Sequence, residues 1–382
     1  GGRARPVSGG GGPAGRSRAV NERAPERPSG GWVAWWYLFL GTALLSGAVT
    51  VAWTHLRADG LTVAAAGGLV GLLAGAAAFS AGLRGTWSRL RGRGRTALVL
   101  ALLLALYPLL IPWCIAVIAT VPARHRVDDS AAVRAGLEVV EITFPAEDGA
   151  ELSGWFADSR NGGFVVVLPG SSSTRSDVVA QTAVFARAGY GVLAVDARGH
   201  GRSGGRAMDF GWGAERDVSS AIDALIERHG GIPDTIAVYG ASLGGEVAIG
   251  AAGTDDRITA VVAEGATGRS VADHEWLPRS FGWRGDAQLV VDRVTFGLAD
   301  ALVPESPPPS LRTSVAAGFP LLLITAGRVS DEGRAAVWIR EGSPDTVRIW
   351  TVPGAGHTGG VRQRPAEWSE RVLEFLALSS AR

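Results

Sequence analysis

The chain has 382 residues, a formal net charge of +1, 47% hydrophobic residues and 19% charged residues. This length favours more than one domain, and the apolar content excludes a disordered chain. The near-zero net charge argues against a general nucleic-acid-binding protein. The single cysteine, Cys114, excludes an intrachain disulfide and a cysteine-based zinc site. The sequence does not begin with Met, and we expect further residues upstream.

The charge is divided unevenly along the chain. Up to Arg126 there are 14 arginines and three acidic residues, a net charge of +11. The remainder carries 23 arginines and 33 acidic residues, a net charge of −10. This asymmetry predicts two physically different parts.

The first part is expected to lie in a membrane. Residues 1–30 are rich in Gly, Arg, Pro and Ser without an apolar period, which predicts a disordered tail. Residues 31–122 are expected to form a membrane region with three transmembrane helices, because each apolar segment exceeds the roughly 20 residues that span a bilayer. These segments are Trp32–Leu56, Leu61–Leu83 and Thr96–Val121.

The arginines that flank these segments predict their orientation. Six precede the first segment, one lies between the first and second, and five lie between the second and third. Three spans would place both arginine-rich stretches on one side, which the positive-inside rule assigns to the cytoplasm. We therefore expect a multi-pass protein of the cell membrane whose C-terminal domain is extracytoplasmic.

Residues 127–382 form the second part, in which short Val-rich runs alternate with helical stretches. This alternation predicts an α/β domain with a mostly parallel, doubly wound sheet covered by helices on both faces. The stretch Gly240-Ala241-Ser242-Leu243-Gly244 joins a predicted strand to a predicted helix. Such a sharp turn exposes the serine hydroxyl at the helix N-terminus, and the glycines avoid crowding there. Ser242 is therefore a candidate nucleophile.

Three further motifs resemble those of the α/β-hydrolase superfamily. They are Asp196-Ala197-Arg198-Gly199-His200-Gly201-Arg202-Ser203 after the fourth strand, Leu168-Pro169-Gly170-Ser171-Ser172 in the position of the oxyanion loop, and Pro353-Gly354-Ala355-Gly356-His357 after the last strand. The resemblance covers 127–382. It implies the α/β-hydrolase fold, with a small cap insertion at about 266–318.

The resemblance also implies a catalytic triad. A serine hydroxyl needs an adjacent base, and His357 lies where the family places it. The family's acid usually stands three residues after a glycine that corresponds to Gly327, but Ser330 occupies that position. Asp331 is therefore the first choice for the acid, and Glu332 is the alternative.

The oxyanion hole is assigned by resemblance to the backbone N–H groups of Leu243 and Ser171. The family often has a histidine before the loop glycine, whereas this chain has Pro169. His200 belongs to the turn motif and is expected to be structural. Glu264 follows a strand, but no second cluster of ligands beside it indicates a metal site.

These features predict a membrane-anchored serine hydrolase that cleaves an ester, thioester or amide through an acyl-enzyme intermediate. We expect a small-molecule or lipid-like acyl substrate, contact with the membrane, no nucleic-acid partner, and neither a cofactor nor a metal. The alternatives are an acyltransferase and a non-catalytic binding or scaffold protein in the membrane. The sequence does not define the bond cleaved, the substrate or the oligomeric state.

Overall fold

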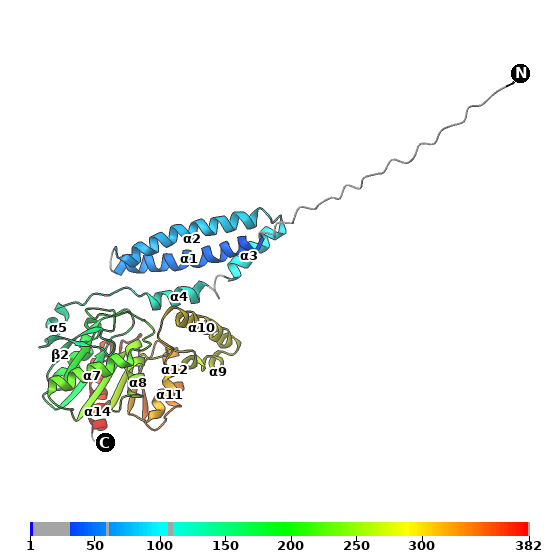
Figure 1. Ribbon diagram of the computed structural model, residues 1–382. Coiled ribbons are helices and arrows are strands. Elements are labelled where there is room, and N and C mark those ends of the chain that lie inside the picture. The colour runs from blue at the N-terminus through cyan, green and yellow to red at the C-terminus, as the bar shows by residue number, and fades with distance from the viewer. Residues whose placement is uncertain (3–30, 59–60, 106–109, 381–382) are drawn as a thin grey trace.

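The computed structural model describes residues 1–2, 31–58, 61–105 and 110–380 (Figure 1). An apolar helical region precedes an α/β domain, and a short helix lies between the two. Almost all of the predicted tail, 1–30, lies outside the described residues.

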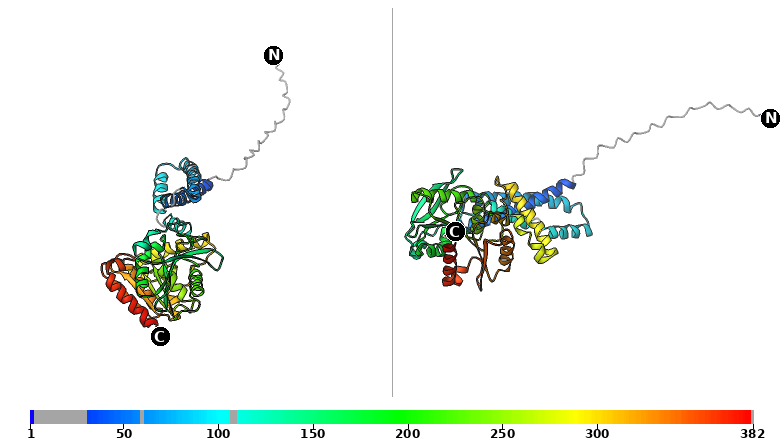
Figure 2. Two further views of the ribbon diagram at one scale, coloured as in Figure 1. Left: turned by 90° about the vertical axis from the view of Figure 1, so that its left-hand side faces the viewer. Right: turned by 90° about the horizontal axis from the view of Figure 1, so that it is seen from below.

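Two long helices, α1 (Gly31–Ala58) and α2 (Val63–Trp87), form an antiparallel hairpin (Figures 1 and 2). Glycines allow the two backbones to approach closely: a Cβ at Gly41 would clash with Phe79, and one at Gly82 would clash with Leu38. Close packing through small residues is typical of membrane helices. Both helices are long and apolar enough to cross a membrane.

Part of the third predicted span, Thr96–Val121, lies outside the described residues. Its described parts belong to α3 (Arg93–Ala105) and α4 (Ile111–Thr120). Pro112 lies in the first turn of α4, where its missing N–H needs no partner. The described residues therefore contain two helices of membrane-spanning length rather than three.

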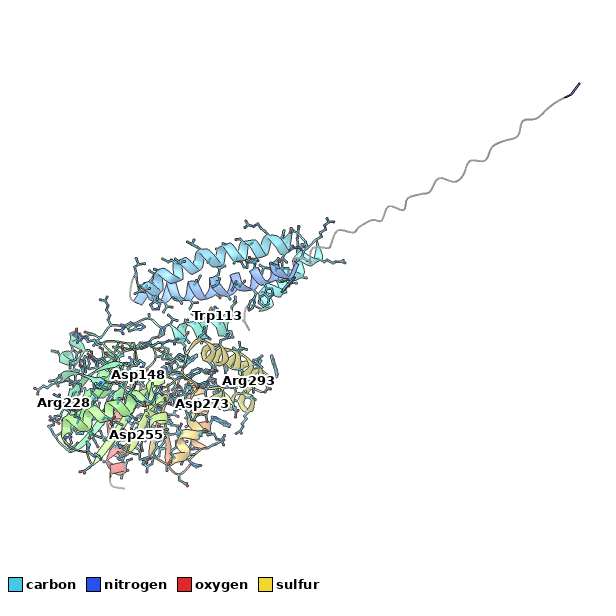
Figure 3. The ribbon with its side chains drawn as sticks, viewed as in Figure 1. Trp113, Asp148, Arg228, Asp255, Asp273 and Arg293 are labelled. Carbon is cyan, nitrogen blue, oxygen red and sulfur yellow. The ribbon has the colours of Figure 1, made fainter. Side chains whose placement is uncertain are left out.

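Helix α4 contacts both parts of the protein. On one side, Trp113 Nε1 donates a hydrogen bond of 2.9 Å to the carbonyl oxygen of Ala43 in α1 (Figure 3). On the other side, the fully buried Ala116 packs with Phe296 and Ala299 of the α/β domain. The Asp209 N–H also donates to the Ala119 carbonyl oxygen at 2.8 Å.

The α/β domain is built on an eight-stranded sheet with the strand order β1-β2-β4-β3-β5-β6-β7-β8. The first three strands in this order pair antiparallel, and the remaining pairs are parallel, which agrees with the predicted mostly parallel sheet. The strands are β1 (Val140–Pro145), β2 (Glu151–Ala157), β3 (Gly163–Leu168), β4 (Gly191–Val195), β5 (Thr235–Ala241), β6 (Ala260–Glu264), β7 (Leu321–Ala326) and β8 (Val347–Val352).

Strands β3 to β7 consist almost entirely of apolar residues and are buried on both sides. Helices therefore cover both faces of the sheet. One apolar core lies between the sheet and α7 and α8, and the other includes residues of α6 and α14. The helices of the domain are α5 (Ser130–Arg134), α6 (Val179–Arg187), α7 (Glu215–His229), α8 (Leu243–Ala252), α12 (Ser330–Arg340), α13 (Gly360–Gln363) and α14 (Pro365–Ser380).

A helical insertion stands between β6 and β7, in the region where the sequence predicts a cap. It contains α9 (Leu277–Phe281), α10 (Trp283–Leu302) and α11 (Leu311–Ser314). The buried side chains of Trp276, Leu277 and Leu289 pack there with Trp338 of α12. The insertion therefore has a small apolar core of its own, fixed to the helix that follows β7.

Candidate active site

Ser242 occupies a strained turn between β5 and α8. Its backbone angles are φ 52° and ψ −121°, a conformation that is uncommon for a residue with a side chain. The turn is held because the Ser242 N–H donates to the Glu264 carbonyl oxygen at 2.7 Å. A Cβ at Gly240 would clash with the Gly244 carbonyl, and a Cβ at Gly244 would clash with the Pro169 carbonyl. Both glycines are therefore required by the close approach of backbone atoms.

His357 lies between Ser242 and a buried carboxylate. Its Nε2 is 2.8 Å from Ser242 Oγ, and its Nδ1 is 2.7 Å from Glu332 Oε1. The hydrogen bond to Glu332 raises the pKa of His357 above its ordinary value, although partial burial of the ring opposes this shift. The structure thus brings together the predicted serine, the predicted histidine and the alternative acid.

Asp331, the first choice for the acid, does not contact His357. Its side chain is 57% exposed and pairs with Arg334 at 2.7 Å. Glu332 is only 1% exposed, and its Oε2 accepts the Ala326 N–H at 2.7 Å. The reason is the start of α12 at Ser330, which turns Asp331 toward solvent and Glu332 toward the sheet. The geometry therefore favours Glu332, the alternative, over Asp331 as the carboxylate that pairs with His357.

The loops that carry the acid and the histidine are joined by backbone hydrogen bonds. The Gly327 N–H donates to the Val352 carbonyl at 2.9 Å, and the Arg328 N–H donates to the Ala355 carbonyl at 3.0 Å. These bonds extend the pairing of β7 and β8 beyond the ends of the strands. They fix the distance between the two loops and therefore between Glu332 and His357.

Glu264 has a structural role that the sequence did not reveal. Its buried carboxylate accepts the Gly360 N–H at 2.7 Å, the Tyr239 hydroxyl at 3.0 Å and the Trp368 indole N–H at 3.1 Å. Burial raises the pKa of Glu264. The residue thus holds the turn of Ser242 through its carbonyl oxygen and the segment after His357 through its side chain.

The predicted oxyanion loop passes directly beside Ser242. A Cβ on Gly170 would lie 3.3 Å from Ser242 Cβ, so the loop backbone is in contact distance of the nucleophile. Leu243 is the first residue of α8, and its N–H therefore has no acceptor within the helix. Both predicted donors, Ser171 and Leu243, thus belong to segments that border Ser242.

Asp209, which no sequence motif indicated, binds the predicted oxyanion loop through its side chain. Its Oδ2 accepts the hydroxyl groups of Ser171 at 2.8 Å and Ser172 at 2.6 Å. Its Oδ1 is 3.2 Å from Nε2 of the buried His200. Burial opposes ionisation of Asp209, but His200 and the two hydroxyl groups hold its pKa below the ordinary value. This carboxylate therefore fixes the side chains of Ser171 and Ser172 beside Pro169.

Asp196 and the rest of the turn motif are structural, as expected for His200. The fully buried Asp196 accepts the Arg175 N–H and the Arg202 N–H, both at 2.9 Å. Arg175 Nη1 also lies 3.3 Å from Asp196 Oδ2. The motif therefore fixes the turn after β4 to the segment after the oxyanion loop.

A cavity of about 300 Å³ adjoins the oxyanion segments. Gly170 and Leu243 contribute to its wall, and its apolar lining includes Met208, Trp212 and Val247. Within the residues that the structure describes, no group of three or more His, Cys, Asp or Glu side chains is arranged to hold a metal ion.

Comparisons with known proteins agree with this architecture. The family model described as serine aminopeptidase S33 matches residues 159–285. An uncharacterised protein of Mycobacterium tuberculosis is 34% identical over 126 residues, which cover 32% of this chain and 43% of that protein. A thiohydrolase of Aspergillus aculeatus is 28% identical over 179 residues, which cover 45% of this chain and 54% of that protein. The chain thus spans about half the length of these curated relatives.

An esterase of Pyrococcus furiosus superposes on the domain with a TM-score of 0.54 and 24% sequence identity. The match covers 68% of this chain and 97% of the esterase. The domain has the α/β-hydrolase fold. The matched family and the shared fold support an enzyme of the serine hydrolase type.

Proposed function

We propose that the protein is a membrane-anchored serine hydrolase with Ser242 as nucleophile, His357 as general base and Glu332 as the acid that orients it. The observation that carries this proposal is the continuous chain from Ser242 Oγ through His357 to Glu332, with contacts of 2.8 and 2.7 Å. A buried carboxylate on Nδ1 favours the tautomer that leaves Nε2 free to accept a proton.

In the first half of the reaction, Ser242 Oγ attacks the acyl carbon as its proton passes to His357 Nε2. The Glu332 carboxylate stabilises the imidazolium that forms. The N–H groups of Ser171 and Leu243 stabilise the negative charge that develops on the carbonyl oxygen. His357 then donates the proton to the leaving alcohol, thiol or amine, and an acyl-enzyme remains on Ser242.

In the second half, water replaces the leaving group and His357 accepts a proton from it. The His357 side chain is 49% exposed, so solvent reaches the base without a movement of the chain. This exposure supports hydrolysis over transfer to a second acyl acceptor. Regeneration of Ser242 Oγ–H releases the carboxylic acid.

The cavity of about 300 Å³ is the proposed site of the acyl group, because it borders the segments that carry both oxyanion donors. Met208, Trp212 and Val247 give part of its wall an apolar surface that suits a short aliphatic or aromatic acyl group, while Arg198, Arg206 and Arg216 line another part. The name of the Aspergillus relative, a thiohydrolase, supports a thioester as one substrate class. Oxygen esters are the other class, since the same carbonyl chemistry applies.

The helical hairpin is proposed to anchor the enzyme in the cell membrane. Trp32, Trp35, Trp36 and Tyr37 are exposed at one end of α1, as at a membrane interface. Val121 O lies 3.2 Å from His55 Nε2, so the chain leaves α4 beside the C-terminal end of α1. An extracytoplasmic domain requires that the segment 96–121 crosses the bilayer as a third span, because two spans would return the chain to the side of the arginine-rich segments. A reporter enzyme fused to the C-terminus and active only in the cytoplasm would contradict that orientation.

Activity is tested with full-length protein in lipid nanodiscs. The substrates are a series of short p-nitrophenyl esters and the matching acyl thioesters. We expect Ser242→Ala to lower kcat by at least about 10³-fold, because the nucleophile is removed while the fold is kept. A Ser242→Ala variant with undiminished turnover would overturn the proposal. Binding of the ester to wild-type protein without turnover would favour the non-catalytic alternative.

A further inference from the structure

The oxyanion loop has a strained backbone that Asp209 holds in place. Ser172 has a φ of 52°, a left-handed conformation that is uncommon for a residue with a side chain. Its hydroxyl donates to Asp209 Oδ2 at 2.6 Å, and the hydroxyl of the neighbouring Ser171 donates to the same oxygen at 2.8 Å. The place of the Ser171 N–H, a proposed oxyanion donor, therefore depends on where Asp209 lies.

Asp209 lies in a segment that helix α4 contacts in two ways. The Asp209 N–H donates to the carbonyl oxygen of Ala119, near the C-terminal end of α4, at 2.8 Å. Trp212, three residues further on, is buried in one apolar cluster with Ala116 of α4 and Phe296 of α10. The ring centroids of Trp212 and Phe296 are 6.2 Å apart. A hydrogen bond and apolar packing thus fix this segment against α4.

The chain that follows α4 holds the other end of the same segment. The His125 carbonyl oxygen accepts the Gly201 N–H at 3.0 Å. Gly201 follows the buried His200, whose Nε2 lies 3.2 Å from Asp209 Oδ1. The stretch between Gly201 and Asp209 is therefore attached at both ends to residues that precede the α/β domain.

Helix α4 is held on its other side by the hairpin (Figures 1 and 3). Trp113 Nε1 donates to the Ala43 carbonyl oxygen of α1 at 2.9 Å. A Cβ at Gly47 would lie 3.0 Å from the same nitrogen, so the indole lies directly against α1. A continuous path of contacts therefore runs from α1 through α4 and Asp209 to the oxyanion loop.

We propose that α4 positions the oxyanion loop through Asp209, so that the catalytic rate depends on the docking of the α1–α2 hairpin on the α/β domain. This dependence rests on the proposed function, because Ser171 supplies one of the two proposed oxyanion donors. A preorganised donor acts on the transition state, so its displacement lowers kcat more than it changes KM. A misplacement of about 1 Å can cost about 100-fold in rate.

The first test adds bulk to the face of α4 that meets the domain. Ala116 is fully buried, so the larger side chain of Ala116→Phe separates α4 from Trp212 and Phe296. The matched control is Ile115→Phe, because Ile115 lies on the same helix and is 41% exposed. Both full-length proteins are assayed in lipid nanodiscs on a short p-nitrophenyl ester. We expect Ala116→Phe to lower kcat at least about tenfold with KM within about twofold, and the control to keep both constants.

A double-mutant cycle shows whether the effect passes through Asp209. Asp209→Ala removes the acceptor of the two serine hydroxyls but keeps the N–H that Ala119 accepts. If α4 acts through Asp209, Ala116→Phe lowers kcat by less than about twofold in the Asp209→Ala protein. Additive losses would overturn the proposal, because they would assign the effect of α4 to the cap helix α10. A wild-type kcat in Ala116→Phe alone would overturn it as well.

The part played by the hairpin has a milder variant of its own. Trp113→Phe keeps an aromatic ring against α1 and removes only the N–H that Ala43 accepts. We expect kcat to fall by about threefold, the value of one modest hydrogen bond, and to be unaffected by this change in the Asp209→Ala protein. An unchanged kcat in Trp113→Phe would contradict the dependence on the hairpin.

Hydrogen exchange measures the same coupling without turnover. The peptide 169–176 covers the oxyanion loop, and two of its backbone N–H groups are bonded to carboxylates at 2.8 and 2.9 Å. We expect this peptide to exchange at least about threefold faster in Ala116→Phe than in Ile115→Phe, with no difference in the peptide 347–352 of β8. Equal exchange of 169–176 in both variants would overturn the proposal. The expected exchange in a wild-type protein without turnover would contradict the proposed function alone.

Discussion

Replacing Glu332 by Gln tests which carboxylate serves the triad. Glu332 Oε2 accepts the Ala326 N–H at 2.7 Å, and Oε1 lies 2.7 Å from His357 Nδ1. In the variant, the amide oxygen must remain on the Ala326 N–H, because the amide nitrogen cannot accept a hydrogen bond. The NH₂ group then donates to Nδ1. His357 is forced into the tautomer that carries its proton on Nε2, and it can no longer accept the proton of Ser242.

The expected effect on kcat is large because the wrong tautomer removes the base without disturbing the fold. The corresponding acid-to-amide change in a serine protease lowers kcat by about 10⁴-fold, or about 5 kcal/mol of transition-state stabilisation. The matched control is Asp331→Asn. Asp331 is 57% exposed and pairs with Arg334, which is 41% exposed, and such a surface pair contributes at most about 1 kcal/mol to stability. The control is expected to keep kcat within about threefold of the wild-type value.

Both variants are assayed on the same soluble ester, and their thermal unfolding is measured in parallel. We expect nearly unchanged thermal unfolding for both proteins and a loss of kcat for Glu332→Gln alone. Equal loss of activity in Asp331→Asn, or a kcat of Glu332→Gln above about a tenth of the wild-type value, would refute the assignment of Glu332.

Three further predictions follow from the geometry. Because Glu332 raises the pKa of His357, kcat/KM should fall as the pH drops through this raised pKa. In Glu332→Gln, the pH–rate profile should have its midpoint at lower pH. An unmoved midpoint would contradict the contact between Glu332 and His357. Asp209→Asn should lower kcat by about 10- to 100-fold with little change in KM, because the substitution loosens the loop that carries Ser171, a proposed oxyanion donor. Steady-state kinetics that show only a higher KM would oppose a role of Asp209 in positioning this donor. Gly240→Ala should lower the free energy of unfolding by about 3 kcal/mol or more, because its Cβ would clash with backbone atoms. Gly333→Ala, whose Cβ meets open space in α12, should raise that free energy by about 0.5–1 kcal/mol. Equal shifts of the two melting temperatures would refute the steric argument.

The proximity of Ser242 and His357 could be predicted from sequence because each stands in a short motif at the end of a strand. Ser242 is flanked by glycines that only a tight strand-to-helix turn requires, and His357 follows the last strand in a Gly-rich loop. The parallel sheet was predictable for the same local reason, since β3 to β7 are continuous apolar runs. Short-range patterns of this kind do not depend on how distant segments pack.

Glu332 was the alternative and not the first choice, because the carboxylate that faces His357 depends on where α12 begins. Counting residues from Gly327 placed Asp331 nearest to the expected position, but the helix starts at Ser330 and turns the next residue outward. A signal was present in the sequence. Glu332, Ala335, Ala336 and Ile339 share one face at helical spacing, and all four are buried. Helical periodicity would have chosen Glu332 over Asp331.

The contact of Asp209 and the packing of α4 could not be predicted in the same way. Asp209 meets Ser171 only because the chain folds back after the turn that follows β4, a contact across 38 positions. The segment Thr96–Val121 is apolar throughout, so composition alone predicts one span and gives no sign that α4 packs between α1 and α10. Long-range packing decides both features.

The central claim is that Ser242 is an activated nucleophile. The most direct measurement is intact-protein mass spectrometry of the membrane-embedded protein after reaction with a fluorophosphonate, followed by peptide mapping of the adduct. We expect a single adduct on Ser242 that forms much more slowly in Glu332→Gln than in Asp331→Asn. A folded protein that forms no adduct, or that carries it on another serine, would contradict an activated Ser242.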